Sequence, residues 1–429
     1  MLRKQYMREA KLKIGEEVEI AGWVHKFVDM GKLKFIFLRD RTGIVQVTAK
    51  KGLVPDELLA RITAGKESVV RVKGTMKESK MAPEGVELIP VEFEVLNEVT
   101  EKLPVDPTEE VPSDLETRLE FRYIDLRRKK INAIFELKSV LSRAFRETLF
   151  NMDFIEMQVP AIIGTASEGG TDVFEVKYFE NRAFLVQSPQ IYKQMAVIGG
   201  VDKVMITMPV FRAEKHNTTS HLNEIYQMDI EMGFADHHDA MDILEKVFIS
   251  MLKAASEKPD LLAACGATVN VPEKIRRFTY TEIIEMLKKA GEQIEWGADF
   301  SREHEKKMYE LIGDEAFFIY EYPTAIRAFY SMPSEKNPKI CNAFDLMYRG
   351  LEISSGAQRI HKADLLAEAL RSRNLDPANF DFYVRAFRFG APPHAGWSIG
   401  LERAAMRICN ADNIREVALF PRDRTRLHP

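Results

Sequence analysis

Hydrophobic and polar residues alternate in several short stretches between residues 17 and 97, and turn residues separate these stretches. This pattern is typical of β-strands with one buried face. A helical pattern interrupts it once, between the third and fourth stretches. We expect a helix at Pro55–Ala64 and strands at Glu17–Phe27, Leu33–Arg39, Gly43–Ala49, Ser68–Met76 and Gly85–Leu96.

Five strands with a helix in this place are typical of an OB-fold barrel, which commonly binds oligonucleotides on its strand face. Alternation in KLKFIFLRD puts Phe35 and Phe37 on one face together with Arg39. Beside Gln46, two aromatic rings could stack on unpaired bases. The alternative is that the rings belong to the barrel core. We favour the core for Phe37 and leave both interpretations open for Phe35.

After residue 102 the amino-acid composition of the chain changes. Residues 103–125 are acidic and contain Pro104, Pro107 and Pro112, which predicts a linker between a domain at 1–102 and a second one at 126–429. A long amphipathic helix is expected at Lys130–Asn151 because apolar residues recur there at helical spacing. The strand-like segment FIEMQVPAI with Pro160 follows it.

The stretch PVFRAEKHNTTSHLNEIYQMDIEM, Pro209–Met232, has the outline of two antiparallel strands joined by a polar loop. The first strand ends at Arg212 and Glu214. A guanidinium at a strand end can grip a phosphate with two parallel hydrogen bonds. The alternative is a surface hairpin with an ion pair.

Two later stretches carry further candidate chemistry. In AFDLMYRGLEISSGAQR, two strand segments hold Asp345 and Glu352, and both carboxylates could reach one Mg²⁺ ion. The alternative is two unrelated surface acids. In GWSIGLERAAM, a strand enters a helix whose first turn carries Arg403, a place suited to a phosphate or a flat base.

Other segments are less informative. The Gly-rich run Gly164–Thr171 lacks the Gly-Lys-Ser/Thr ending of a P-loop; it is either a lid carrying Glu168 or a plain loop. Residues 236–335 contain helical patterns and no trusted motif, which suggests a helical, insertion-like region. A metal site at His237 and His238 is not favoured, because adjacent helical residues face different directions.

Composition narrows the class of protein. The chain has 429 residues, 45% hydrophobic, with a net charge of −4; residues 1–102 carry 19 Lys and Arg against 16 Asp and Glu, which is compatible with a polyanionic partner. Three cysteines without a paired spacing make a disulfide framework unexpected and favour a reducing compartment. No apolar run is long enough to span a membrane, so we expect a cytoplasmic protein.

Taken together, these stretches resemble the class II aminoacyl-tRNA synthetases, and among them the aspartyl enzymes of the archaeal and eukaryotic type. The resemblance runs from about Glu17 to Pro429. The helix with Pro160 matches the first class II motif, Phe211–Glu214 with its loop the second, and Gly400–Arg403 the third. It implies an α+β protein: an OB-fold anticodon-binding domain followed by an antiparallel sheet flanked by helices, acting as a homodimer.

The resemblance also implies roles for matching residues. Arg212 and Arg403 would be catalytic, activating L-aspartate with ATP as an aspartyl-adenylate before transfer to tRNA. The ATP site would comprise Arg212, Glu214, Ser220, His221, Leu222, Glu352, Gly400, Leu401, Glu402 and Arg403. The aspartate site would comprise Glu168, Ser188, Gln190, Lys193, Arg212, Asp229, Ser355 and Arg359, and Mg²⁺ would be held by Asp345, Glu352 and Ser355.

Lys193 and Arg359 would clamp the side-chain carboxylate of aspartate. Because an asparagine amide would leave these buried cations unpaired, the pair predicts rejection of asparagine. Two residues depart from the family pattern. Ser220 stands where an arginine is usual, which removes one cation from the ATP loop. Ser398 stands where the third motif usually has its first glycine, and we expect a slightly different strand path there.

In the first domain, the resemblance assigns anticodon contacts to His25, Phe35, Gln46, Pro83 and Glu87. Enzymes strict for tRNA(Asp) resemble one another in having Trp and Lys at the positions of His25 and Pro83. We therefore expect the relaxed type, which also charges tRNA(Asn) and implies a downstream amidotransferase. Neutral drift at two loop positions is the alternative. Other open alternatives are a strict aspartyl enzyme, an asparaginyl enzyme and a non-catalytic RNA-binding paralogue.

Overall fold

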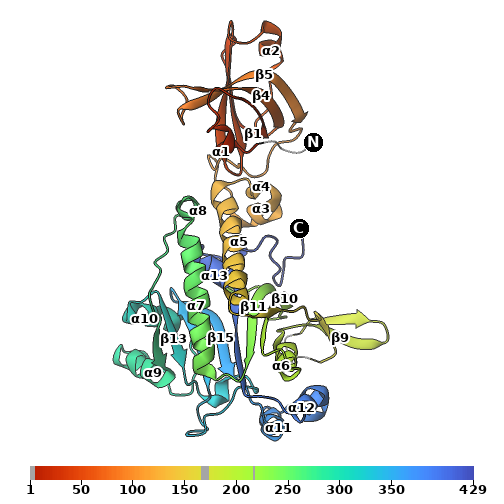
Figure 1. Cartoon of the computed structure of the whole chain (residues 1–429), viewed down its shortest axis with the longest axis vertical. Helices are drawn as coiled ribbons and strands as arrows, with labels where there is room; N and C mark the ends of the chain where they lie inside the picture. Colours follow the sequence, from red (N-terminus) through yellow and green to blue (C-terminus); the bar gives the residue numbers. More distant parts are fainter. Residues whose placement is uncertain (1–4, 166–172, 216–217) are drawn as a thin grey trace. The chain divides into compact units, whose positions relative to one another are not determined.

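The computed structural model describes residues 5–165, 173–215 and 218–429 (Figure 1). The chain divides into two compact units, Met1–Asn132 and Ala133–Pro429. Residues 103–125, predicted as a linker, thus fall within the first unit. They also contain two short helices, α3 (Leu115–Glu120) and α4 (Arg122–Asp125). Arg122 and Asp125 are fully buried and their side chains lie 2.6 Å apart, so this segment has packed structure of its own.

The first unit contains a closed five-stranded barrel with the strand order β1-β2-β3-β5-β4. The predicted OB-fold barrel is therefore confirmed. Each observed strand lies within two residues of its predicted bounds, and a short helix lies between the third and fourth strands. The elements are α1 (Met7–Ala10), β1 (Glu17–Asp29), β2 (Leu33–Asp40), β3 (Gly43–Lys50), α2 (Asp56–Arg61), β4 (Val69–Glu78) and β5 (Val86–Asn97).

Along β2 the buried residues are Lys34, Ile36, Leu38 and Asp40, and the residues between them are only half-buried. The aliphatic residues Ile36 and Leu38 belong to the barrel core. The prediction that Phe37 belongs to the core is wrong, because the alternation of the strand turns its side chain to the outer face together with Phe35.

The second unit is built on an eight-stranded sheet with the order β12-β13-β14-β15-β16-β11-β10-β6. Six strands run antiparallel, and only the pairs β12–β13 and β10–β6 are parallel. The strands are β6 (Ile155–Glu156), β10 (Lys203–Phe211), β11 (Glu224–Gly233), β12 (Arg276–Thr279), β13 (Ala316–Tyr320), β14 (Ala343–Tyr348), β15 (Glu352–Gln358) and β16 (His394–Gly400).

Helices cover this sheet. On one face α7 (His237–Ser256) crosses β15 and β16, and α5 (Lys129–Phe150) lies beside it, as Figure 1 shows. Thr148 of α5 donates to Ser250 of α7 at 2.8 Å, and Phe145 meets the buried Trp397 edge to face. On the opposite face α6 (Gln190–Ile198) packs against β10 and β11. The side chains that α6 and β11 direct toward each other form part of the site described below.

Residues 236–335 were predicted to form a helical, insertion-like region, but the structure shows that they are not purely helical. They do contain α7, α8 (Pro259–Cys265), α9 (Tyr280–Lys289) and α10 (Arg302–Ile312). However, β12 and β13 from this region extend the central sheet, and Phe317 and Ile319 of β13 are fully buried. The region is therefore part of the main core. The remaining helices of the unit are α11 (Ala363–Ser372), α12 (Asp381–Phe387) and α13 (Leu401–Ile408).

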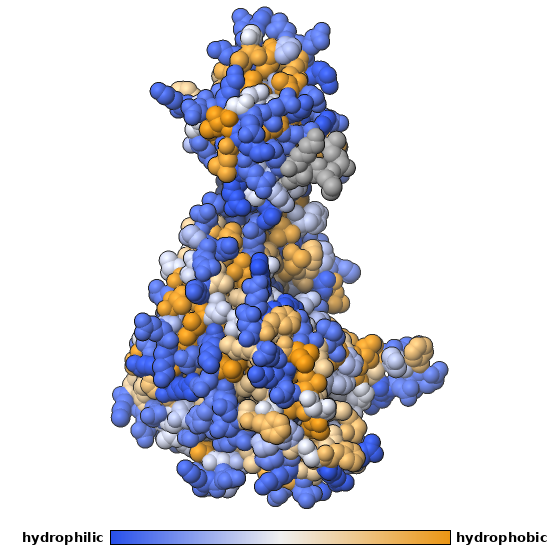
Figure 2. All heavy atoms as spheres, in the orientation of Figure 1, coloured by the Kyte–Doolittle hydropathy of each residue, from blue (hydrophilic) through white to orange (hydrophobic). Residues whose placement is uncertain are grey.

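A small three-stranded sheet, β7-β9-β8, stands beside the main one and projects from it in Figure 1. Its strands are β7 (Ile162–Ile163), β8 (Glu175–Tyr178) and β9 (Asn181–Leu185). Hydrophilic residues cover most of the visible surface, with hydrophobic ones scattered among them (Figure 2). Within the part of the chain that the structure describes, no helix has the length and apolar character needed to cross a membrane.

Candidate active site

Two arginines from distant parts of the second unit line one cavity. Arg212 directly follows β10, and Arg403 lies in the first turn of α13, just after β16. The cavity has a volume of about 40 Å³. Its other lining residues are Glu214, Ser220, His221, Leu222, Ile225, Gly400, Glu402 and Ile414.

The two guanidinium groups have little neutralising charge close to them. Arg212 Nη1 lies 3.9 Å from Glu214 Oε1, and Arg403 Nη1 lies 3.7 Å from Glu352 Oε1. Arg403 also donates to the carbonyl of Glu352 at 3.2 Å. Two cations that converge on one cavity with only loose partners are suited to bind an anion such as a phosphate.

A polar loop forms one wall of the cavity. His221 Nδ1 lies 2.6 Å from Thr218 Oγ1 and 3.3 Å from Ser220 Oγ, while its Nε2 lies 3.4 Å from Arg403 Nη2. Ser220, which replaces the usual arginine, therefore supports the His221 ring instead of supplying a cation. Arg415 braces the same loop by donating to the Thr218 carbonyl at 3.0 Å.

Two further residues predicted for ATP are Leu401 and Glu402. Leu401 lines the hollow beside α5 and not this cavity, so its contact with ATP stays a prediction. Glu402 accepts from Lys138 Nζ at 2.7 Å and from the backbone of Tyr226 at 2.9 Å. It thereby ties α5 and β11 to the first turn of α13, which carries Arg403.

The predicted metal ligands are only partly available. Both oxygens of Asp345 accept from Arg327, at 2.8 and 2.7 Å, and Arg327 also donates to Ser355 at 2.6 Å. Within the described residues there is no group of three or more His, Cys, Asp and Glu side chains arranged around a metal position. The site of Asp345, Glu352 and Ser355 stays a prediction, and in this structure the Arg327 guanidinium bonds to two of its three members.

Glu352 remains a suitable single ligand. Burial, and then repulsion by Asp345, raise the pKa of its carboxyl to about 7. A buried carboxyl of this kind is stabilised in its charged form by a cation. Mg²⁺ commonly binds one or two carboxylates and completes its shell with substrate phosphates and water.

The residues predicted for the amino acid gather between α6 and β11. Lys193 Nζ donates to Asp229 at 2.8 Å and to the carbonyls of Ile230 and Trp397 at 3.2 and 3.3 Å. Arg359 forms a two-pronged pair with Glu231, at 2.9 and 3.2 Å. Lys193 lies 3.5 Å from the same Glu231 carboxylate, so the structure brings Lys193 and Arg359 together.

Ser188 and Gln190 lie at the start of α6, and both are buried. Ser188 Oγ accepts from the Gln190 backbone at 3.1 Å, and the Gln190 amide donates to Gln194 at 2.9 Å. Gln194 is in turn bonded to His394 and Tyr383, at 2.8 and 2.6 Å. Glu168 lies outside the described residues.

Glu231 changes the expected electrostatics of this pocket. Lys193 and Arg359 were expected to be two cations without protein partners, yet Asp229 and Glu231 balance them. Burial alone would raise the pKa of Glu231, but the charges of Arg359 and Lys193 outweigh it and hold that pKa below its ordinary value. Arg359 donates to Glu231 through Nε and Nη2, which leaves its Nη1 as a donor for a ligand.

Glu231 was not predicted as a site residue, although a signal for it was present. It lies two positions after Asp229 on β11, and strand alternation puts both side chains on one face. The opposite position on β16 is Gly396, where an added Cβ would lie 2.2 Å from Glu231 Oε2. The space that a side chain at Gly396 would need is therefore filled by the Glu231 carboxylate. Arg327 was also missed, and nothing in its local sequence pattern indicates its partner Asp345.

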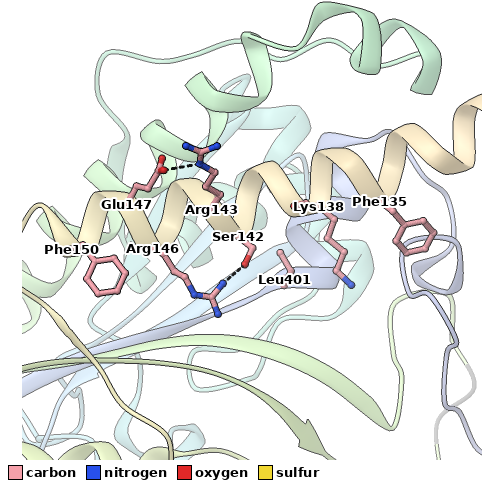
Figure 3. Close-up of a pocket in the computed structure, with 9 residues that line it drawn as sticks. Phe135, Lys138, Ser142, Arg143, Arg146, Glu147, Phe150 and Leu401 are labelled. Atoms are coloured by element: carbon pink, nitrogen blue, oxygen red, sulfur yellow. Dashed lines mark hydrogen bonds and ion pairs between the residues drawn. The ribbon is translucent and has the colours of Figure 1, made fainter. Parts of the chain in front are cut away.

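A second cavity, larger than the one that Arg212 and Arg403 line, lies beside α5. It has a volume of about 560 Å³ and runs along α5, where Lys138, Ser142, Arg143 and Arg146 project from the helix (Figure 3). Phe135, Phe150 and Leu401 add apolar surface. Apart from Leu401, none of its lining residues was predicted for the active site, so size alone would point to the wrong place.

In the first unit, three of the predicted anticodon residues lie on neighbouring strands. Gln46 and Thr48 both donate to Glu87, at 3.2 and 2.5 Å. Phe35 is paired with Thr48 across β2 and β3, and Phe37 is paired with Gln46. Phe37 therefore lies in the row that contains Gln46 and Glu87, and it is the aromatic residue that sequence reasoning assigned to the core.

The two residues expected to set tRNA choice lie on β1 and in a loop of the barrel. His25 is at the β-bulge of β1, and its Nδ1 lies 3.0 Å from Arg39 Nη1. Burial, and then the charge of Arg39, lower the pKa of His25, so the ring is neutral at pH 7. Pro83 lies in the loop between β4 and β5. No hydrogen bond or ion pair joins these two residues within the described part of the barrel.

Comparisons with known proteins agree with this architecture. Residues 114–424 match the model of the family "tRNA synthetases class II (D, K and N)", and residues 18–96 match that of the "OB-fold nucleic acid binding domain". The chain belongs to the class II tRNA synthetases of this group.

Individual relatives cover the whole chain. The "Aspartate--tRNA(Asp/Asn) ligase" of Methanocaldococcus jannaschii is 48% identical, over 100% of this chain and 98% of its own. The "Aspartate--tRNA(Asp) ligase" of Pyrococcus furiosus is 46% identical over 100% of both. The crystal structure of asparaginyl-tRNA synthetase from Pyrococcus horikoshii, complexed with asparaginyl-adenylate, matches with a TM-score of 0.94 at 33% identity, over 100% of both chains.

Proposed function

We propose that this chain is an aspartate–tRNA ligase that activates L-aspartate with ATP and transfers the aspartyl group to tRNA(Asp) and to tRNA(Asn). The observation that carries the proposal is the convergence of Arg212 and Arg403 on one cavity. Relatives with the corresponding name and near-complete coverage support the same activity. Aspartate-dependent ATP–pyrophosphate exchange without tRNA is the direct test, and a chain without this exchange is not the proposed enzyme.

In the proposed reaction the α-carboxylate of aspartate attacks the α-phosphorus of ATP and pyrophosphate leaves. Arg212 would hold the α-phosphate, and Arg403 with His221 would hold the other end of the triphosphate. Positioned cations stabilise the charge that develops on the phosphate oxygens. The terminal adenosine hydroxyl of tRNA would then attack the aspartyl carbonyl of the adenylate, forming an ester as AMP leaves. Glu214, with its side chain on the cavity wall, would contact adenine or the tRNA end.

Mg²⁺ would enter with ATP and neutralise the leaving pyrophosphate. Glu352 would hold it, with the phosphates supplying further ligands. Asp345 and Ser355 would join only if Arg327 released them, because Arg327 bonds to both.

The choice of aspartate rests on the cluster around Glu231. Asp229 would receive the α-ammonium group, and Arg359, through its remaining Nη1 donor, would receive the side-chain carboxylate, with Lys193 behind it. Lys193→Leu should reduce aspartate-dependent exchange by orders of magnitude, because it leaves Asp229 and Glu231 short of a cation. An unchanged rate would remove the role of Lys193 in specificity.

An asparaginyl enzyme is the second candidate, favoured by the close likeness to the Pyrococcus horikoshii structure. The discriminating measurement is exchange with asparagine in place of aspartate. Lys193 argues for aspartate, since related asparaginyl enzymes lack this lysine in the equivalent segment. Exchange driven by asparagine and not by aspartate would establish the second candidate.

The choice of tRNA is a separate part of the proposal. Overall similarity does not decide it, because relatives named for both specificities are 46 to 48% identical. The proposal rests on His25 and Pro83, which lack the bulk and charge of the Trp and Lys typical of strict enzymes. The double change His25→Trp with Pro83→Lys should lower charging of tRNA(Asn) at least tenfold relative to tRNA(Asp). If the unchanged chain does not charge tRNA(Asn), the relaxed type is excluded.

Further partners complete the proposal. A homodimer would form through α5, which matches the first class II motif. An amidotransferase would convert the aspartyl group on tRNA(Asn) to asparaginyl. A cytoplasmic location fits the three cysteines, which are all reduced and buried.

A further inference from the structure

A row of polar residues crosses the floor of the amino-acid site on four adjacent strands. In the register of the sheet, Asp345 of β14 faces Ser355 of β15, Ser355 faces Ser398 of β16, and Ser398 faces Asp229 of β11. Residues directly opposite each other in antiparallel strands project from the same face. The four side chains therefore form one line across the sheet.

Within this row Ser398 is bonded to the residue proposed to receive the substrate ammonium group. Ser398 Oγ donates to Asp229 Oδ2 at 3.0 Å, while Asp229 Oδ1 accepts from Lys193 Nζ at 2.8 Å. Each carboxylate oxygen of Asp229 thus accepts from one donor, and the residue is only 1% exposed to solvent.

The sequence led us to expect a slightly different strand path at Ser398, and this stays a prediction, although the strand pairs regularly with its neighbour. From Gln227↔Gly400 to Gly233↔His394, β11 and β16 pair without a register shift. The serine sits in a regularly paired strand, and its hydroxyl supplies a donor that a glycine would lack.

We propose that Ser398 is a positioning residue of the amino-acid site, whose hydroxyl fixes the Asp229 carboxylate in the orientation that receives the α-ammonium group of the substrate. The inference rests on the proposed function. A carboxylate held at one oxygen can rotate about its Cβ–Cγ bond, whereas one held at both oxygens is preorganised for its ligand. The Ser398 oxygen keeps acceptor capacity while it donates to Asp229, so it can also accept from the ammonium group.

Three substitutions separate this role from a merely structural one. Ser398→Ala and Ser398→Gly remove the hydroxyl, and Ser398→Thr retains it on a residue that strands favour. The matched control is Ser354→Ala on the neighbouring strand β15. Ser354 is 2% exposed, and its Oγ has no hydrogen-bond partner within the described residues.

The measurement is steady-state ATP–pyrophosphate exchange, with the KM for aspartate and the KM for ATP determined separately. Ser398→Ala and Ser398→Gly should raise the KM for aspartate about tenfold, the factor expected for one hydrogen bond to a charged group. The KM for ATP and kcat should stay within about twofold, because a contact made equally in ground and transition states affects KM alone. Ser398→Thr and Ser354→Ala should behave like the unchanged chain.

Several outcomes would overturn the inference. One is an unchanged KM for aspartate in both the Ala and Gly variants. Another is an equal rise in both KM values, which would show a general disturbance of the sheet. If Ser398→Ala does not fold, Ser398→Gly provides the same comparison with the residue usual in the family. Absence of exchange in the unchanged chain would instead overturn the proposed function and, with it, this inference.

Discussion

At the scale of single residues, the site depends on charges that balance each other inside the protein. Glu231 is the centre of this balance, since Arg359 and Lys193 both reach its carboxylate. Sequence reasoning found both cations but not the anion between them. Residue types near a motif indicate which charges are present, whereas their pairing depends on side-chain directions that only the folded sheet defines.

The first prediction concerns this anion. Glu231→Gln should lower the free energy of unfolding by about 3–5 kcal/mol, because it leaves the buried Arg359 without a charged partner and Lys193 with Asp229 alone. Urea unfolding at pH 7 measures the change. Glu224→Gln, on the same strand but only half-buried, is the control and should change stability by less than about 0.5 kcal/mol.

The pH dependence of the same variant follows from the lowered pKa of Glu231. A carboxyl with a lowered pKa contributes stability that is present above its ordinary pKa of about 4.5 and is lost as the pH falls through its folded value. The difference in the free energy of unfolding between the unchanged chain and Glu231→Gln should therefore become smaller as the pH falls. A difference that grows in acid would contradict the assignment of Glu231 as a paired carboxylate.

A second prediction concerns Phe37, which lies in the row of Gln46 and Glu87 on the outer face of the barrel. Phe37→Ala should lower kcat/KM for tRNA charging by about 10- to 100-fold, since stacking on one base contributes about 1–3 kcal/mol. Exchange without tRNA should not change. Val91→Ala removes an exposed apolar residue from the same barrel and should leave charging intact. If Phe37→Ala charges tRNA with the same kcat/KM as the unchanged chain, Phe37 has only a structural role.

At the scale of elements, the segment after α13 controls the loop that presents His221. Ile414 donates its backbone N–H to the Thr219 carbonyl, and Asn223 donates its own to Arg422. Arg415 bridges Asp423, at 2.6 Å, and the Thr218 carbonyl. These contacts join residues about 200 positions apart in the chain, so the sequence pattern of the loop does not indicate them.

The third prediction tests this bracing. Arg415→Ala should raise the KM for ATP about tenfold, because His221 and Arg403 would lose their fixed separation. The KM for aspartate should stay nearly unchanged. Arg424→Ala, an exposed arginine in the same segment, is the control. A rise of similar size in the control would show that charge, and not bracing, matters.

The elements themselves were largely predictable. The strands of the barrel, α5, the hairpin β10–β11 and the step from β16 into α13 all appear close to the expected positions, because amphipathic periodicity and turn residues are local signals. Residues 103–125 and 236–335 were assigned less well. Short helices with few apolar positions and strands buried on both faces carry weak periodicity.

At the scale of the whole molecule, the groove along α5 is the surface proposed to meet a second copy. Phe150→Glu should convert the proposed dimer into a monomer, because it places a charge on an apolar part of this surface. Sedimentation velocity measures the change. Leu12→Glu alters an exposed leucine of the first unit and should leave the oligomeric state unchanged. A dimer that persists in the Phe150 variant would place the interface elsewhere.

The sequence by itself determined the barrel, the long helix and the hairpin and indicated the two arginines that line one cavity, because each depends on local periodicity or on a short motif. Only the tertiary structure decided which charges neutralise each other. In the folded chain, Glu231 pairs with both Lys193 and Arg359. Asp345 pairs with Arg327, and the Ser398 hydroxyl donates to Asp229. The physical reason is that electrostatic and hydrogen-bonded partners are chosen by distance in space, and the fold brings together residues as far apart in the chain as Glu231 and Arg359 or Asp229 and Ser398.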